Sequence, residues 1–281
     1  MSISLLTNVT SLQAQQNLNK TQNSLSASIE RLSSGMRINS ASDDAAGLGI
    51  SESLQSQISS LGQASQNAND AVSLSQVAEG GMSQMQGIVS RMRDLAVESA
   101  NSTLGATQRG YIQTEFTQLA SEINRISATS NFNGQQLLDG SASAGLTFQV
   151  GINNTSNDRL SLSITRLVTS TLGSTSLHLA SVSLSTATNA QAALGAFDAA
   201  ITQLSTARAN LGAVQNRMQD AISNLSTTTS NLTAANSAIT DVDIASETAK
   251  MTQDNILEQA GVSVLSQANQ LPSIALKLLG Q

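Results

Sequence analysis

The side chains that most often carry out chemistry in proteins are scarce in this chain of 281 residues. His178 is the only histidine and there is no cysteine. This excludes metal sites built from several imidazoles or thiolates, and most nucleophiles paired with a histidine base. His178 lies in a segment rich in serine and threonine, and we interpret it as a surface residue. We therefore expect no catalytic residue, no metal site and no cofactor, and a protein that is not an enzyme.

Two pairs of aspartates could supply acid and base groups. Asp43 and Asp44 come directly before an apolar helical pattern, where carboxylates cap a helix N-terminus and complement its dipole. Asp241 and Asp243 precede the last helical pattern in the same way, and the spacing of Thr240 and Asp243 matches a capping box. We interpret both pairs as helix caps rather than as catalytic groups.

Glycines and methionines offer two further candidate sites. Gly47 and Gly49 form a GLG sequence without a lysine or a preceding strand, so we do not expect phosphate binding. Met82, Met85 and Met92 recur at helical spacing, and flexible thioethers commonly fill gaps in an apolar core. We interpret these methionines as core residues rather than as metal ligands.

The composition favours thin helical seams over a round core. Aromatic residues make up 2% of the chain and hydrophobic residues 40%, so aliphatic side chains must form most apolar contacts. The net charge of −6 argues against nucleic acid and membranes as partners. No apolar run reaches the roughly 18 residues of a membrane span, and the start MSISLLTNVTSLQAQQ lacks the features of a cleaved signal peptide. We expect a protein that is either cytosolic or exported without a cleaved signal.

Apolar residues at alternating spacings of three and four predict long amphipathic helices at both ends of the chain. The N-terminal segment carries Leu18, Leu25, Ile29, Leu32 and Met36. The segment from about residue 241 carries Leu257, Val264, Ala268, Leu271 and Leu278. Full burial of one leucine or isoleucine is worth roughly 1.5–3 kcal/mol, so we expect these two stripes to dominate any pairing of the chain ends.

Three further helices are predicted between these ends. One runs from about residue 44 to about residue 100 with two adjacent apolar stripes, which indicates contact with more than one neighbouring helix. The next carries a stripe from Ile112 to Ile126, and a third keeps one register from Leu194 to Ile239. Polar residues at the remaining positions of this last stripe fix register at a cost in stability; they are Arg208, Gln215, Thr229 and Asn236.

The centre of the chain follows a different pattern. After NFNG at 131–134, apolar residues alternate with others over 146–152 and again over 160–164. Because two asparagines lie between the runs, we predict a β-hairpin. Residues 167–188 show no firm period, and we assign them no element. The predicted fold is mainly α, with long antiparallel coiled-coil-like helices from both termini and a small β-hairpin insert in the middle.

Six stretches of this sequence occur in the same order in one known family. They are SIERLSSGMRINSASDDAAGLGIS, QASQNANDAVSLSQVAEGGM, RMRDLAVESANST, EINRISATSNFNG, RANLGAVQNRM and VSVLSQANQLPSIALKLLG. Together they cover most of 1–140 and 190–281, including both chain ends. On these stretches the chain resembles the bacterial flagellins.

The resemblance implies a structural subunit of the bacterial flagellar filament, an extracellular structure used for swimming. It implies inner-tube helices at 1–40 and 240–281, outer-tube helices within 41–140 and 189–239, and a short variable, surface-facing insert at 141–188. Isolated terminal segments cannot bury both sides of their stripes, so we expect them to be disordered in the monomer and helical in the polymer. The candidate polymerisation seam consists of Leu18, Leu25, Ile29, Leu32, Leu257, Val264, Leu271 and Leu278.

The resemblance also implies partners. Many copies would form a homopolymer, and the flagellar export chaperone, the filament cap and the hook-filament junction proteins would contact it. The stretch RMRDLAV resembles the one that vertebrate Toll-like receptor 5 binds in many flagellins, and the matching contact candidates are Arg91, Leu95 and Glu115. The alternative interpretation is that Arg91 and Glu115 are solvated helix residues, while Leu95 belongs to the subunit seam.

Two other functions also fit the helical pattern. A hook-filament junction protein resembles flagellin at its ends, and a helical scaffold or binding module would pair with partners without polymerising. The close match of NANDAVS and of ANQLPSIALKLLG to the flagellins favours a filament subunit.

Overall fold

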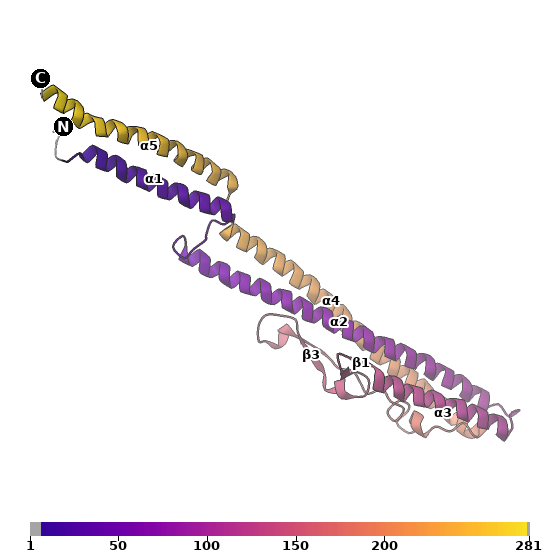
Figure 1. The fold of residues 1–281 in the computed structure, drawn as a ribbon. Helices are drawn as coiled ribbons and strands as arrows, with labels where there is room; N and C mark the ends of the chain where they lie inside the picture. The colour runs from indigo at the N-terminus through magenta and orange to yellow at the C-terminus, as the bar shows by residue number, and fades with distance from the viewer. Residues whose placement is uncertain (1–6, 280–281) are drawn as a thin grey trace. The chain divides into compact units, whose positions relative to one another are not determined.

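The computed structural model describes residues 7–279, with the side chains of 271–279 outside the description. Within these residues the order of elements is three helices, a small β region and two helices, which confirms the predicted fold (Figure 1). The helices are α1 (Val9–Ser34), α2 (Ala45–Ser99), α3 (Ala106–Thr129), α4 (Ala187–Thr240) and α5 (Ile244–Leu279). The strands are β1 (Asn131–Phe132), β2 (Gln135–Gln136), β3 (Leu146–Gln149) and β4 (Arg159–Leu162).

The chain divides into two compact units, each with its own packing. The central unit is Gln57–Ser230, and the terminal unit combines Met1–Ser56 with Asn231–Gln281. α2 and α4 contribute residues to both units.

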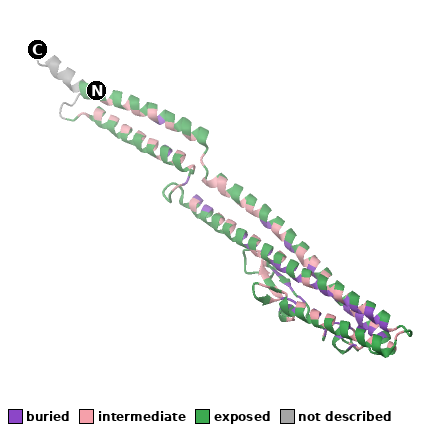
Figure 2. Cartoon of the chain, turned by 45° about the vertical axis from the view of Figure 1, so that its right-hand side comes forward, coloured by how far each residue is buried: buried purple, intermediate pink, exposed green. Residues whose placement is uncertain are grey.

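The central unit holds the apolar core, to which α2, α3 and α4 all contribute (Figure 2). Phe116 of α3 and Phe197 of α4 meet edge to face, with ring centroids 6.0 Å apart. Met82, Met85 and Met92 are at most 1% exposed, which confirms that these methionines are core residues. The two stripes predicted on α2 follow from its position against two other helices of this core.

Two small hairpins follow α3 in the central unit. β3 and β4 pair antiparallel from Leu146 opposite Leu162 to Gln149 opposite Arg159, which confirms the predicted hairpin with shorter strands than the alternation suggests. β1 and β2 form a second hairpin within the NFNG region. Its two-residue turn places Asn133 at φ 50° and Gly134 at φ 81°, a left-handed conformation that an Asn-Gly pair tolerates well.

Residues 163–186 form an irregular strap, which the sequence pattern does not identify. Four of its five leucines are buried in the central core. Gln203 of α4 anchors the strap, because its amide donates to the Gly173 carbonyl at 2.8 Å and accepts from the Gly173 amide at 3.2 Å. Asn124 of α3 accepts a hydrogen bond from the Thr169 amide at 3.1 Å. His178 is exposed on this strap, as predicted. The buried leucines are Leu167, Leu172, Leu179 and Leu184.

In the terminal unit, α1 and α5 lie side by side and run antiparallel (Figure 1). α1 begins after Asn8, whose side-chain oxygen accepts a hydrogen bond from the Ser11 amide at 3.1 Å. α1 ends at Gly35, which has φ 73° and donates its amide to the Arg31 carbonyl at 2.9 Å. Only glycine adopts this left-handed cap at little cost, so Gly35 sets the point where the chain leaves α1.

Two of the predicted aspartate caps are confirmed. The Asp44 carboxylate accepts hydrogen bonds at the start of α2, including one from the Gly47 amide at 2.9 Å. The Asp243 carboxylate accepts from the Ala245 amide at 3.0 Å and from the Ser246 amide at 3.3 Å at the start of α5. Each carboxylate thus satisfies amides that have no partner inside the helix.

The other two aspartates do not cap helices, and the predicted capping box is wrong. The Thr240 hydroxyl donates back to the Asn236 carbonyl at 2.9 Å, so it belongs to the last turn of α4. Asp241 accepts from the side chains of Ser237 and Thr240. Asp43 organises the loop before α2. The spacing alone does not reveal that α4 extends through Thr240.

Candidate functional site: the terminal helix pair

The face that α1 turns toward α5 combines leucines with small and polar residues. Its less exposed positions recur at spacings of three and four, as a seam requires. On α1 the series at this spacing is Ser11, Ala14, Leu18, Thr21, Leu25, Ser28 and Leu32. On α5 they are Glu247, Met251, Asp254, Glu258, Gly261, Leu265 and Ala268.

Close packing in this seam depends on small side chains. A Cβ atom at Gly261 would lie 3.2 Å from the Leu18 side chain, so glycine is what lets the helices approach here. Polar contacts across the pair include Ser11 Oγ donating to Asn269 Oδ1 at 2.6 Å and Gln22 Nε2 donating to Glu258 Oε1 at 3.1 Å. The pair therefore forms with modest apolar burial.

The seam also buries polar atoms that lack partners. Ser28 is fully buried and Asp254 is 9% exposed. Within the described residues, neither Ser28 Oγ nor Asp254 Oδ2 has a hydrogen-bond partner. A buried polar group without a partner costs about 1–3 kcal/mol, so these residues weaken the pairing of α1 with α5.

Many large apolar side chains of the terminal unit point away from the seam, and Figure 2 shows both helices largely exposed. Ile256, at 61% exposed, and Val264, at 54%, illustrate this on α5, and Ile29 is 51% exposed on α1. A single pair of helices leaves this apolar surface in water, where it stabilises nothing. The outward apolar surface consists of Val9, Leu12, Ile29, Met36, Ile244, Ile256, Leu257, Val262 and Val264.

A shallow apolar cleft of about 270 Å³ opens between the two helices on this surface. Leu257 and Val264 of α5 form one side of it, and Leu18 of α1 contributes to the other. Such a cleft can accept an apolar side chain from another helix. Its lining is Ala14, Asn17, Leu18, Thr21, Leu257, Ala260, Gly261 and Val264.

The residues predicted for the polymerisation seam lie on two different faces. Leu18, Leu25 and Leu32 are half-buried toward α5, whereas Ile29, Leu257 and Val264 point outward. Leu271 and Leu278 belong to α5, but their side chains lie outside the described residues. The sequence pattern does not identify Ile256 and Val262, because they fall outside the single register that links Leu257 to Leu278. The role of these residues in polymerisation stays a prediction.

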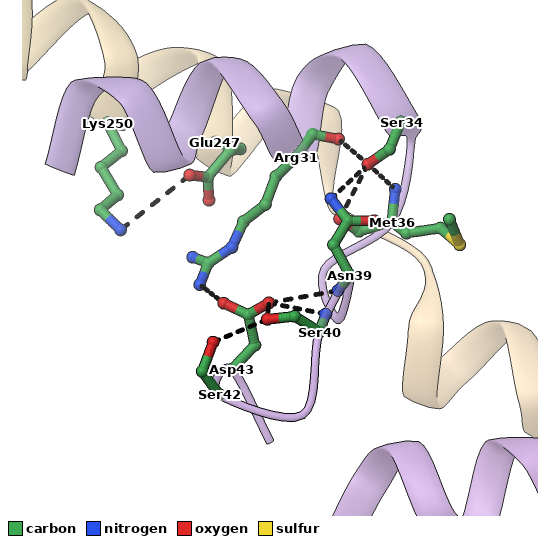
Figure 3. Close-up of polar contacts among 9 residues, drawn as sticks. All are labelled: Arg31, Ser34, Met36, Asn39, Ser40, Ser42, Asp43, Glu247 and Lys250. Carbon is green, nitrogen blue, oxygen red and sulfur yellow. Dashed lines mark hydrogen bonds and ion pairs between the residues drawn. The ribbon is translucent and has the colours of Figure 1, made fainter. Parts of the chain in front are cut away.

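Asp43 is the centre of a polar cluster in the loop between α1 and α2 (Figure 3). Its carboxylate accepts from the Ser40 amide and the Ser40 hydroxyl, each at 3.0 Å, and from the Asn39 amide at 3.3 Å. Arg31 of α1 donates to the other oxygen at 3.3 Å. The Ser40 hydroxyl, followed by the backbone amides and Arg31, holds the pKa of Asp43 below its usual 3.8.

Backbone hydrogen bonds clamp this loop to the link between α4 and α5. The Arg37 amide donates to the Thr240 carbonyl at 2.6 Å, and the Val242 amide donates to the Gly35 carbonyl at 3.0 Å. The Arg37 guanidinium also donates to the Ile239 carbonyl at 2.6 Å, satisfying an acceptor at the end of α4. We call residues 35–37 and 239–242 the clamp. It lies where α1 ends and α5 begins.

The receptor candidates lie in the central unit. Arg91 of α2 and Glu115 of α3 form an ion pair of 2.8 Å with both side chains about half exposed, at 52% and 44%. Leu95 is 1% exposed and packs in the central core. A partner at this surface could contact Arg91 and Glu115, but Leu95 is covered by the core of its own chain.

No reactive constellation appears in the part of the chain that the structure describes. Among these residues, no group of three or more histidine or acidic side chains could hold a metal ion. The helices within 7–279 include none that is long and apolar enough for a membrane span. The terminal unit instead defines a helical structural protein with an apolar surface that its own chain leaves uncovered.

Comparison with known proteins assigns the family. Residues 5–143 match the bacterial flagellin N-terminal helical region, and residues 194–279 match the bacterial flagellin C-terminal helical region. The chain belongs to the bacterial flagellin family.

Named relatives agree with this assignment. A flagellin of Halalkalibacterium halodurans is 42% identical over 97% of this chain and 98% of its own length. The flagellar filament 33 kDa core protein of Treponema phagedenis is 38% identical over the same shares of the two chains. A solved structure, the flagellin of Bacillus cereus, is 29% identical, covers 61% of this chain and 94% of its own, and has a TM-score of 0.49.

Proposed function

We propose that this flagellin is a structural subunit that polymerises into the bacterial flagellar filament, which serves swimming. The observation that carries the proposal is the outward apolar surface of α1 and α5 in a member of this family. The names of two relatives, a flagellin and a flagellar filament core protein, support the same role. The subunit would act outside the cell, as part of this filament.

Burial on neighbouring copies supplies the driving force. Covering one isoleucine, leucine or valine side chain is worth roughly 1.5–3 kcal/mol. Ile256, Leu257, Val262 and Val264 of α5 are each about half exposed or more, so a few such contacts outweigh the polar cost within the seam. The homopolymer is therefore the partner that the terminal unit fits best.

Seeded filament growth tests this proposal. The double change Ile256→Ser and Val264→Ser removes two outward apolar side chains, and we expect it to abolish growth from seeds, measured by sedimentation and electron microscopy. The matched control, Gln259→Ser with Gln267→Ser, changes two exposed polar positions of the same helix and should grow normally. Normal growth of the apolar double variant would refute the assignment of this surface.

Further partners are proposed from the family. The export chaperone, the filament cap and the hook-filament junction proteins would each meet the terminal helices, because an uncovered apolar helix face needs cover before and after polymerisation. Contacts with these proteins would form before the contacts between copies, or would take their place.

Toll-like receptor 5 is a further proposed partner, through Arg91 and Glu115. Both side chains are accessible and carry opposite charges on adjacent helices, which suits recognition by a polar interface. Leu95 would act indirectly, by holding α2 in the core. The variant Arg91→Ala should lower signalling in a receptor reporter assay, and unchanged signalling would argue against this contact.

A further inference from the structure

Methionines of this chain differ sharply in exposure. Met82, Met85, Met92 and Met218 are at most 1% exposed in the central unit. Met251 is half-buried in the seam between α1 and α5. Of the methionines within the described residues, Met36 alone is exposed, at 43%. Access of a small oxidant to sulfur should follow the same order.

Met36 occupies a sensitive position in the clamp. Its backbone pairs with Asp241 in an antiparallel bridge, flanked by the hydrogen bonds from Arg37 to Thr240 and from Val242 to Gly35. These bonds make Met36 and Asp241 a non-hydrogen-bonded pair, in which facing side chains come closest and lie on one side. Figure 3 shows the Met36 thioether directed away from the Asp43 cluster.

We propose that Met36 is an oxidation site through which peroxide controls assembly of this protein. The sulfur lone pair attacks one peroxide oxygen and an S–O bond forms while the O–O bond breaks. The second oxygen leaves as water after taking up the proton that the first oxygen loses. Sulfur is oxidised by two electrons and peroxide is reduced, giving a sulfoxide in place of the thioether.

The sulfoxide changes the surface in two ways. Met36 belongs to the outward apolar surface that the proposed function assigns to contacts between copies, and a polar S–O group there must be desolvated before a neighbour can cover it. The sulfoxide oxygen also carries partial negative charge beside the Asp241 carboxylate, its partner in the bridge. Both effects disfavour addition of the oxidised chain to a filament, so this inference rests on the proposed function.

Hydrogen peroxide treatment of the purified full chain, followed by peptide mass spectrometry and seeded growth, tests the inference. We expect sulfoxide at Met36 while the four core methionines stay unmodified, together with loss of seeded growth. The variant Met36→Leu should keep its growth after treatment, and Met251→Leu should lose growth as the wild type does. Methionine sulfoxide reductase should restore growth of the treated wild type, which keeps the test valid should Met36→Leu assemble poorly.

Two results would overturn the inference. One is oxidation of the core methionines as fast as Met36; the other is equal loss of growth in treated Met36→Leu and wild type. Seeded filament growth of the untreated wild type is measured as a separate test of the filament function. Its failure would count against the filament function, while the mass spectra would still decide whether Met36 is oxidised selectively.

Discussion

A single carboxylate organises the exit from the first helix. Asp43 accepts hydrogen bonds from Ser40 and Asn39 and forms an ion pair with Arg31. The loop conformation therefore depends on the negative charge of Asp43. Protonation removes the attraction to Arg31 and makes the carboxyl a weaker acceptor. The conformation of this loop should therefore depend on pH.

The direction of this effect follows from the lowered pKa of Asp43. Because the folded chain binds this proton less tightly than the unfolded chain, the carboxylate stabilises the loop fully above its unfolded pKa, near the usual aspartate value of 3.8. The contribution disappears as the pH falls through the lower pKa of the folded state. We expect the amides of Ser40 and Asn39 to lose protection from hydrogen exchange in that range.

The variant Asp43→Asn removes the charge and should leave these amides weakly protected at every pH. Glu30→Gln is the control, since Glu30 is exposed on α1 outside the Asp43 cluster and should leave the titration unchanged. A wild-type protection pattern that is flat from neutral pH down to pH 2 would contradict the role given to Asp43.

At the scale of elements, α4 carries polar residues in a stripe that is otherwise apolar. Gln215 occupies this stripe, and its Nε2 atom is buried without a hydrogen-bond partner in the described structure. Arg208 is satisfied in part, since it donates to Gln86 at 2.7 Å and lies 3.5 Å from Glu79, while its Nε atom is buried without a partner among the described residues. Gln215 thus carries the cost in stability expected of a polar residue that fixes register.

Replacing Gln215 with leucine should therefore stabilise the central unit. The change removes a buried unsatisfied amide and adds apolar contact with the core, and we expect the free energy of unfolding to rise by about 1 kcal/mol in chemical denaturation. Gln219→Leu, one turn further along and exposed, should change it by less than about 0.5 kcal/mol. Destabilisation by Gln215→Leu would mean that the amide has a favourable partner.

Periodicity predicted the elements well because most of them are long and regular. α2 and α4 span many turns, so single polar interruptions do not hide their stripes. The strap at 163–186 escaped prediction because its buried leucines are held by isolated contacts, such as those of Gln203 and Asn124, instead of by a repeating backbone. Burial there is decided by distant residues.

The candidate site was predictable only in part. Spacing places Ile29 in line with Leu18 and Leu25, but it cannot tell which face a neighbouring helix covers. The structure pairs α1 and α5 through leucines such as Leu18 together with small or polar residues such as Ser28 and Gly261, and it turns Ile29 outward. The clamp left no periodic signal at all, since it consists mainly of backbone hydrogen bonds.

At the scale of the whole molecule, stability is divided unequally between the two units. Every residue of the two buried apolar clusters belongs to the central unit. The terminal unit offers a seam with unpaired Ser28 and Asp254 and a large uncovered apolar surface. Each unit should therefore open with its own free energy, as local stability varies with buried apolar contact.

Hydrogen exchange on the monomer and the filament measures this division directly. In the monomer we expect amides of α1 within residues 9–34 to exchange rapidly, because a weak seam does not offset the conformational entropy of two ordered helices. Amides near Met85 and Phe197 should be protected in both states, since their side chains are fully buried. In the filament, contacts between copies cover the outward apolar surface, and α1 should become protected. Full protection of α1 in the monomer would show that the pair is stable alone, and the apolar surface would then lose its part in ordering the chain.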